Sequence, residues 1–264
     1  MSLLTETEIL TFLDKLADLS AAAILPHFRA ALTIEDKGQG QFDPVTVADR
    51  AAERVIVEAI QQQFPTHAIL GEEFGARAGT ASYRWIIDPI DGTRAFMSGV
   101  PTWGTLIGLW HGETPLYGMM TQPFIGERFI GSPHGAWWRR GNARVPLHTR
   151  QSSSLATASL FATAPEMFEP TFEWPRFQAL AARARLTRYG VDCYAYCLLA
   201  AGHIDLVVEA GLGLYDVAAL IPIIEAAGGV ITDWTGQPLR DGGRVIAAAT
   251  IALHAEALAV LGGT

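Results

Sequence analysis

The sequence predicts an α/β (α+β) protein whose two lobes share one continuous body. Three observations favour this fold class: helical periodicity over the first sixty residues, a strand-rich middle, and strand–helix alternation after about Arg150. Half of the 264 residues are hydrophobic and only 17% are charged, which excludes an intrinsically disordered chain. At this length, a single domain over residues 1–264 with a self-sufficient core is expected.

The N-terminal segment predicts two helices. Leu10, Leu13 and Leu16 follow helical spacing in the first, which runs through the first thirty residues. Residues 37–40, Lys-Gly-Gln-Gly, predict a flexible turn. A second apolar periodic segment extends from about 46 to 64, where Pro65 follows and ends the helix.

The middle of the chain predicts strands. Residues 67–70 and 83–88 are short apolar runs of the kind that form buried strands, and the second contains Trp-Ile-Ile. Between Trp103 and Trp138, several β-like runs are separated by Gly and Pro, which predicts an antiparallel meander.

The last part of the chain alternates between the two element types. Helices are expected at 175–182, 191–201, 216–227 and 251–262, and strands at 204–208, 229–232 and 244–248. We therefore expect an N-terminal α+β lobe over residues 1–145 and a C-terminal α/β lobe over residues 146–264.

The charge balance limits the possible partners. The formal net charge is −8, with 27 acidic against 19 basic residues. Nucleic acids and anionic membranes bind to basic surfaces, so neither is an expected partner. The N-terminus is acidic where a secretory signal would be basic, which favours a cytoplasmic protein.

Carboxylates stand at the edges of several predicted elements. Ligand sites gather at strand ends in α/β folds, and these residues are candidates for one: Asp49, Glu72, Asp88, Asp91 and Asp216. The most specific piece is the run 88–93, Asp-Pro-Ile-Asp-Gly-Thr, because two carboxylates flank a turn that leads into a short helix. We expect Asp91 to be the N-cap of that helix.

A helix N-terminus that faces carboxylates can bind a phosphate when hard cations neutralise those carboxylates. Mg²⁺ takes oxygen ligands and completes its shell with phosphate oxygens. The backbone N–H groups of Gly92 and Thr93 can then bind the phosphate. Nothing in this pattern requires a covalent nucleophile, because phosphoryl transfer depends on positioning and charge stabilisation.

The motifs resemble those of the inositol monophosphatase family, which is related to fructose-1,6-bisphosphatase. A Glu-Glu turn at 72–73, Trp-Ile-Ile-Asp-Pro-Ile-Asp-Gly-Thr at 85–93, Asp-Val-Ala-Ala at 216–219 and Ala-Gly-Gly at 227–229 occur in the family's order. The resemblance covers residues 40 to 235. It implies a layered αβαβα sandwich, a homodimer, and a phosphatase with two or three Mg²⁺ ions per active site.

The resemblance also implies roles for single residues. Glu72, Asp88 and the Ile90 carbonyl would bind one metal, and Asp88, Asp91 and Asp216 a second. Thr93, supported by Asp49, would orient or deprotonate the attacking water.

The segment at 188–196, Arg-Tyr-Gly-Val-Asp-Cys-Tyr-Ala-Tyr, is similar to a signature of the family's histidinol-phosphatase branch, except that Val191 replaces a Gly. In the family, the positions of Asp192 and Glu209 lie near the non-phosphate end of the substrate. Two further carboxylates suit a phosphate ester with a cationic head. Histidinol phosphate has such a head, and we expect its hydrolysis in histidine biosynthesis.

Three other interpretations remain open. Asp192 is a plain helix N-cap in the first. In the second, the protein is an inositol-1-phosphate or broad sugar-phosphate phosphatase of the same fold. In the third, it is a regulatory or RNA-polymerase-associated protein, against which the intact carboxylate set and the acidic charge both count.

Overall fold

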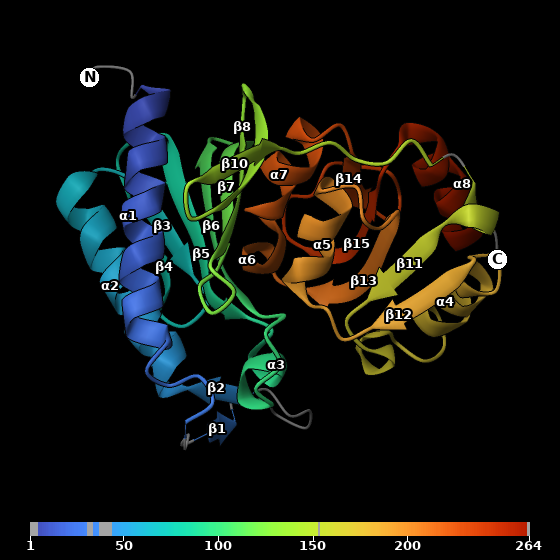
Figure 1. Ribbon diagram of the computed structural model, residues 1–264, viewed down its shortest axis with the longest axis horizontal. Helices are drawn as coiled ribbons and strands as arrows, with labels where there is room; N and C mark the ends of the chain where they lie inside the picture. Colours follow the sequence, from blue (N-terminus) through green and yellow to red (C-terminus); the bar gives the residue numbers. More distant parts are fainter. Residues whose placement is uncertain (1–4, 31–33, 37–43, 153, 263–264) are drawn as a thin grey trace.

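The computed structural model describes residues 5–30, 34–36, 44–152 and 154–262. Within them the chain forms five layers, helix–sheet–helix–sheet–helix, which confirms the predicted αβαβα sandwich (Figure 1). The predicted turn at 37–40 lies outside the described residues. None of the helices in the described part of the chain has the length and apolar character needed to cross a membrane.

The first layer holds the two long N-terminal helices, α1 (Glu6–Ile24) and α2 (Val47–Gln63). Each begins with a capping box, in which a threonine and an acidic residue three positions later cap each other's backbone N–H groups. Their apolar faces pack around Trp85 on the eight-stranded sheet of the second layer, which we call the first sheet. In the sequence between the two helices, β1 (Ile34–Asp36) and β2 (Pro44–Thr46) form a small antiparallel pair.

The second layer is an eight-stranded sheet in the order β10-β9-β8-β7-β6-β5-β3-β4. The predicted meander is confirmed, because β5 through β10 pair antiparallel in sequence. The strands are β3 (Ala68–Gly71), β4 (Gly75–Arg77), β5 (Tyr83–Asp91), β6 (Gly104–His111), β7 (Thr114–Gln122), β8 (Glu127–Ser132), β9 (Gly135–Arg140) and β10 (Ala143–Pro146).

The fourth layer is a five-stranded sheet in the order β12-β11-β13-β15-β14, in which β11 pairs parallel with β12 and β13. Its strands are β11 (Ser159–Ala162), β12 (Leu186–Tyr189), β13 (Leu206–Leu212), β14 (Val230–Asp233) and β15 (Gly243–Ala248). Within the described residues, every strand before residue 147 belongs to the β1–β2 pair or to the eight-stranded sheet. Every later strand belongs to this five-stranded sheet.

The remaining helices fill the third and fifth layers (Figure 1). α5 (Cys193–Ala200), α6 (Leu214–Val217) and α7 (Leu220–Ala226) lie between the sheets, and α4 (Glu173–Ala181) and α8 (Ile251–Gly262) cover the outer face. Two short 3₁₀ helices lie at Leu155–Thr157 and Pro165–Met167. The short helix α3 (Thr93–Met97) follows β5.

One predicted helix is wrong. The segment 216–227 forms two helices, α6 and α7, that meet near Ala218. The Ala218 carbonyl accepts a hydrogen bond from the indole N–H of Trp110, at 3.2 Å, in the first sheet. Pro222 in α7 has no N–H to donate to this carbonyl four positions earlier, so a continuous helix breaks here and the indole satisfies the freed acceptor.

Candidate active site

The C-terminal end of β5 places the first two carboxylates. The pairing of β5 with β6 shifts register between Asp88 and Asp91, which marks a β-bulge. The backbone N–H of Ile90 donates to Oδ1 of Asp88 at 3.0 Å, so the turn orients the Asp88 carboxylate. Bulges re-aim side chains in this way, and here the carboxylates of both aspartates join one group.

The third carboxylate, Asp216, comes from α6 on the opposite side of the interface between the sheet and the helices. Its Oδ2 accepts the N–H of Gly213 at 2.6 Å. Its position depends on how closely the α6–α7 segment approaches the sheet. A Cβ at Gly118 would lie 1.8 Å from the Ala219 carbonyl oxygen, so only glycine fits there.

The fold brings Asp88, Asp91 and Asp216 together. One carboxylate oxygen from each lies within 4.8 Å of the others. Burial raises the pKa of Asp88 well above its usual value, and the negative charges of Glu72, Asp91 and Asp216 raise it further. Burial and the charges of Asp216 and Asp192 likewise raise the pKa of Asp91, while its hydrogen bonds to Cys193 lower it.

This cluster has the chemistry of a hard-cation site. Three buried or half-buried carboxylates with converging oxygens repel one another unless protons or cations neutralise them. Oxygen-only ligands suit Mg²⁺ rather than a soft metal. The residues present therefore fit a magnesium ion.

Glu72 belongs to the edge of this group. It directly follows β3, and its N–H donates to the Ile87 carbonyl at 3.2 Å. Behind this turn lies Glu53, a buried residue of α2 whose carboxylate accepts the N–H groups of Glu73, at 2.7 Å, and Phe74, at 2.9 Å. No sequence motif points to Glu53, although it stands one helical turn after Asp49 and shares its face.

The start of α3 differs from the expectation. Gly92, with φ 82°, is the N-cap, and no side chain caps the helix. Asp91 is not the N-cap, because the bulged strand extends to it and its Oδ2 accepts the Cys193 N–H at 2.7 Å instead. The Thr93 hydroxyl donates to the Ile90 carbonyl at 3.2 Å.

Asp49 is buried at the start of α2. Its Oδ2 accepts the backbone N–H and the hydroxyl of Thr46 at 2.9 and 2.5 Å. Burial raises its pKa to about 6 against the lowering effect of these hydrogen bonds. Among the described residues, its hydrogen bonds go to Thr46 and not to Thr93, so its support of Thr93 stays a prediction.

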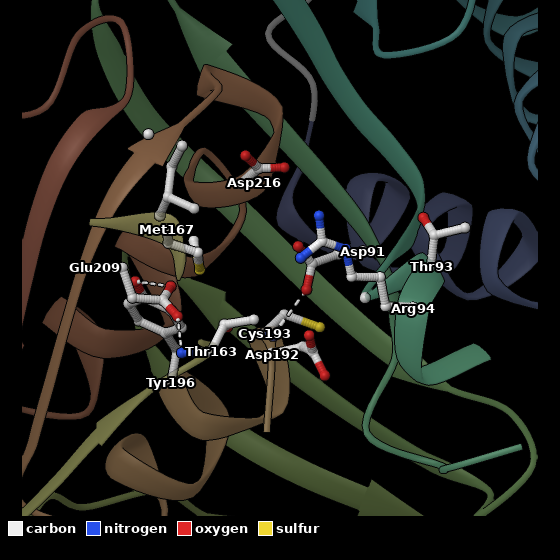
Figure 2. A pocket seen from close by; sticks show the side chains of 13 residues that line it. Asp91, Thr93, Arg94, Thr163, Met167, Asp192, Cys193, Tyr196, Glu209 and Asp216 are labelled. Atoms are coloured by element: carbon white, nitrogen blue, oxygen red, sulfur yellow. Dashed lines mark hydrogen bonds between the residues drawn. The ribbon is translucent and has the colours of Figure 1, made fainter. Parts of the chain in front are cut away.

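A cavity of about 230 Å³ opens beside the carboxylate cluster (Figure 2). Both halves of the chain line it, and they place two of the predicted metal ligands, Asp91 and Asp216, around one space with the predicted phosphate and recognition residues. The lining residues are Asp91, Gly92, Thr93, Arg94, Thr163, Met167, Asp192, Cys193, Tyr196, Glu209, Gly211, Leu212 and Asp216.

Asp192 stands at the N-cap position of α5, but its side chain makes no capping hydrogen bond. The carboxylate instead accepts the hydroxyl of Thr102 at 3.0 Å. Burial raises the pKa of Asp192, and the Thr102 hydrogen bond and the charge of Arg94 lower it. The plain N-cap interpretation of Asp192 is therefore wrong.

Glu209 lies within β13, directly before a register shift, rather than at the end of the strand as expected. Its carboxylate accepts the Thr163 N–H and the Tyr196 hydroxyl, both at 2.8 Å (Figure 2). Burial raises its pKa to about 7 although both hydrogen bonds lower it. Tyr196 is the second residue that the sequence analysis did not single out: it stands in the 188–196 signature, one helical turn after Asp192.

Comparisons with known proteins give matches within one enzyme family. The family described as the inositol monophosphatase family matches residues 5–262. The bifunctional phosphatase IMPL2, chloroplastic, of Arabidopsis thaliana is 42% identical over 239 residues, which is 89% of this chain and 67% of that protein. A histidinol-phosphatase of Streptomyces coelicolor is 36% identical over 252 residues, 93% of this chain and 94% of that protein.

A solved structure extends the likeness to the fold. The structure of an inositol monophosphatase from Zymomonas mobilis superimposes with a TM-score of 0.87 at 39% identity, and the match covers 98% of this chain and 100% of that one. Its name differs from that of the Streptomyces relative in the substrate, so the comparisons point to the reaction class more sharply than to the ester.

Proposed function

The chain belongs to the inositol monophosphatase family and is a phosphoric monoester hydrolase, and from this premise we propose that it hydrolyses L-histidinol phosphate to L-histidinol and phosphate. The observation that favours this substrate is the cavity itself. Beyond the metal cluster, its wall holds two further carboxylates, the buried Glu209 and the half-buried Asp192.

Mg²⁺ would be held by Asp88, Asp91 and Asp216, with Glu72 and the Ile90 carbonyl beside them. When bound, it would activate a water and neutralise the charge that develops on the leaving oxygen. The protein's part is to fix the ligands: a backbone N–H holds one oxygen of each of the three aspartates.

Thr93 would orient the attacking water. Its hydroxyl proton is directed to the Ile90 carbonyl, so its oxygen lone pairs are available to accept a hydrogen bond from a neighbouring water. The phosphate would bind at Gly92 and Thr93, where α3 begins at the cavity wall.

Asp192 and Glu209 in the cavity wall would bind the cationic head of the substrate. Histidinol phosphate has an amine and an imidazole on the carbon chain that bears the phosphate, whereas inositol phosphate has only hydroxyl groups there. A carboxylate in a cavity wall is stabilised more by a cation, which adds charge–charge attraction to the hydrogen bond, than by a neutral hydroxyl. Two such carboxylates therefore favour the aminated ester.

The second candidate is an inositol-1-phosphate phosphatase. The 39% identity to the Zymomonas mobilis inositol monophosphatase supports it. The same metal cluster would serve either ester, so the two candidates differ only in what Asp192 and Glu209 contact.

Phosphate release from L-histidinol phosphate and from inositol 1-phosphate, each with Mg²⁺ and with a chelator, tests the proposal. We expect kcat/KM to favour histidinol phosphate by at least about tenfold, which corresponds to about 1.4 kcal/mol. Chelation should abolish both activities. Asp88→Asn is the matched control for the metal, and it should lose on the order of a thousandfold in kcat. A preference for inositol phosphate would overturn the substrate assignment, and full turnover by Asp88→Asn would overturn the metal role.

A further inference from the structure

Asp192 sits on strained backbone. Its φ of 48° and ψ of −148° place it in a region that residues with a side chain rarely adopt. Among the described residues other than glycine, only Arg29 shares a positive φ. Such strain costs free energy and persists where the surroundings hold the residue in place.

Two hydrogen bonds and one close fit hold the backbone of this stretch and the side chain of Asp192. The N–H of Cys193, the next residue, donates to the Asp91 carboxylate at 2.7 Å. The Thr102 hydroxyl donates to Oδ2 of Asp192 at 3.0 Å, with the Gly190 carbonyl as a more distant second acceptor at 3.5 Å. Gly92 leaves the necessary space, because a Cβ there would lie 3.0 Å from the Cβ and Cγ of Asp192.

Thr102 reaches Asp192 from outside the cavity. It lies in the segment between α3 and β6, ninety positions before Asp192 in the sequence, and it is not among the residues that line the cavity. Its hydroxyl is therefore positioned to orient the carboxylate without contacting a bound ester.

The Asp192 carboxylate has a competing partner. Arg94 lines the same cavity, and its charge lowers the pKa of Asp192. A carboxylate that turned towards Arg94 would be neutralised by the protein and would attract a cationic substrate less strongly. The Thr102 hydrogen bond opposes that rotation.

We propose that Thr102 is a positioning residue for substrate selectivity: its hydroxyl holds the Asp192 carboxylate in the cavity wall, where it can meet the cationic head of a phosphate ester. This inference rests on the proposed function, because it assigns Asp192 to recognition of that head.

Thr102→Val, which removes the donor at nearly constant volume, tests the inference, and Thr102→Ser keeps the donor. KM and kcat are measured with L-histidinol phosphate and with glycerol 2-phosphate, whose alcohol carries no charge. We expect Thr102→Val to raise KM for histidinol phosphate about tenfold, since a hydrogen bond to a charged group is lost. The kcat values and the KM for glycerol 2-phosphate should stay within about twofold, and Thr102→Ser should restore the low KM.

The double variant Thr102→Val/Asp192→Asn shows whether Thr102 acts through Asp192. We expect it to bind histidinol phosphate no more weakly than Asp192→Asn alone. Thr102→Ala gives a second donor-free variant if the valine protein does not fold.

Four outcomes would overturn the inference. Equal rises in KM for both esters would show a purely structural role, and so would a serine variant that fails like valine. An unchanged KM for histidinol phosphate in a protein that still prefers this ester would overturn the Thr102 inference alone. A wild-type protein without that preference would overturn the proposed function as well.

Discussion

Burial changes the properties of single carboxylates in this protein, and Glu209 shows how far. It is fully enclosed in β13, and its pKa is raised to about 7 although two donors point at it. Because the folded-state pKa lies above the usual 4.5, the bound proton stabilises the folded state fully below about pH 4.5. That stabilisation is lost as the pH rises through about 7.

Glu209→Gln removes this titration and keeps the shape of the side chain. In chelator-treated protein, we expect the variant and the wild type to have similar free energies of unfolding at pH 4.5. By pH 8, the variant should be more stable by about 2–3 kcal/mol. Urea unfolding at several pH values measures the difference, and the histidines cancel because both proteins contain them. A difference that stays constant over this range would contradict the raised pKa.

Sequence patterns identified these residues better than they identified their partners. The positions of Asp88, Asp91 and Asp216 followed from motifs, and the fold does bring the three together. The capping role expected of Asp91 was wrong, because whether a strand ends or bulges depends on its pairing with β6, which lies outside the local pattern. The contact between Thr102 and Asp192 joins segments ninety positions apart, and no local pattern predicts it.

At the scale of elements, the site depends on how closely the α6–α7 segment packs on the first sheet. Gly118 in β7 and Gly131 in β8 both lie against this segment. A Cβ at Gly118 would lie 1.8 Å from the Ala219 carbonyl oxygen, and one at Gly131 would lie 2.3 Å from the Pro222 carbonyl carbon. The absence of two side chains therefore sets the distance between the sheet and the helix that carries Asp216.

Gly118→Ala should push this segment away from the sheet. We expect a loss of about 2–3 kcal/mol in the free energy of unfolding, as for other overpacked cores. Mg²⁺-dependent phosphatase activity should also fall, because Asp216 lies three residues from the displaced Ala219. Gly262→Ala is the matched control, since a Cβ there meets nothing within 4 Å, and it should change stability by less than about 0.5 kcal/mol. A Gly118→Ala protein as stable and active as that control would contradict this packing.

The helices, the strands and the meander were predictable because their periodicity is local. The joint between α6 and α7 also has a local cause, because Pro222 inside the expected helix 216–227 cannot donate to the Ala218 carbonyl, which accepts the Trp110 indole N–H instead. The extension of β13 past Glu209 has a non-local cause. That strand continues to Leu212 because it pairs with β15, across a register shift.

At the scale of the whole molecule, two sheets and the helices between them meet at one cavity. The first sheet and α3 supply Asp91 and Thr93, and the later part of the chain supplies Asp192, Glu209 and Asp216. The net charge of −8 also becomes intelligible. Seven acidic residues, a number close to the whole acidic excess, are those assigned to the site, where bound cations would reverse the local sign and attract an anionic ester.

The central claim is that the later part of the chain selects a cationic head for a phosphate held by the earlier part. The most direct test is the effect of Asp192→Asn on KM for L-histidinol phosphate relative to KM for glycerol 2-phosphate. We predict that KM for histidinol phosphate rises about tenfold or more while KM for glycerol 2-phosphate, which has no cationic head, hardly changes. Equal changes in the two KM values would contradict it.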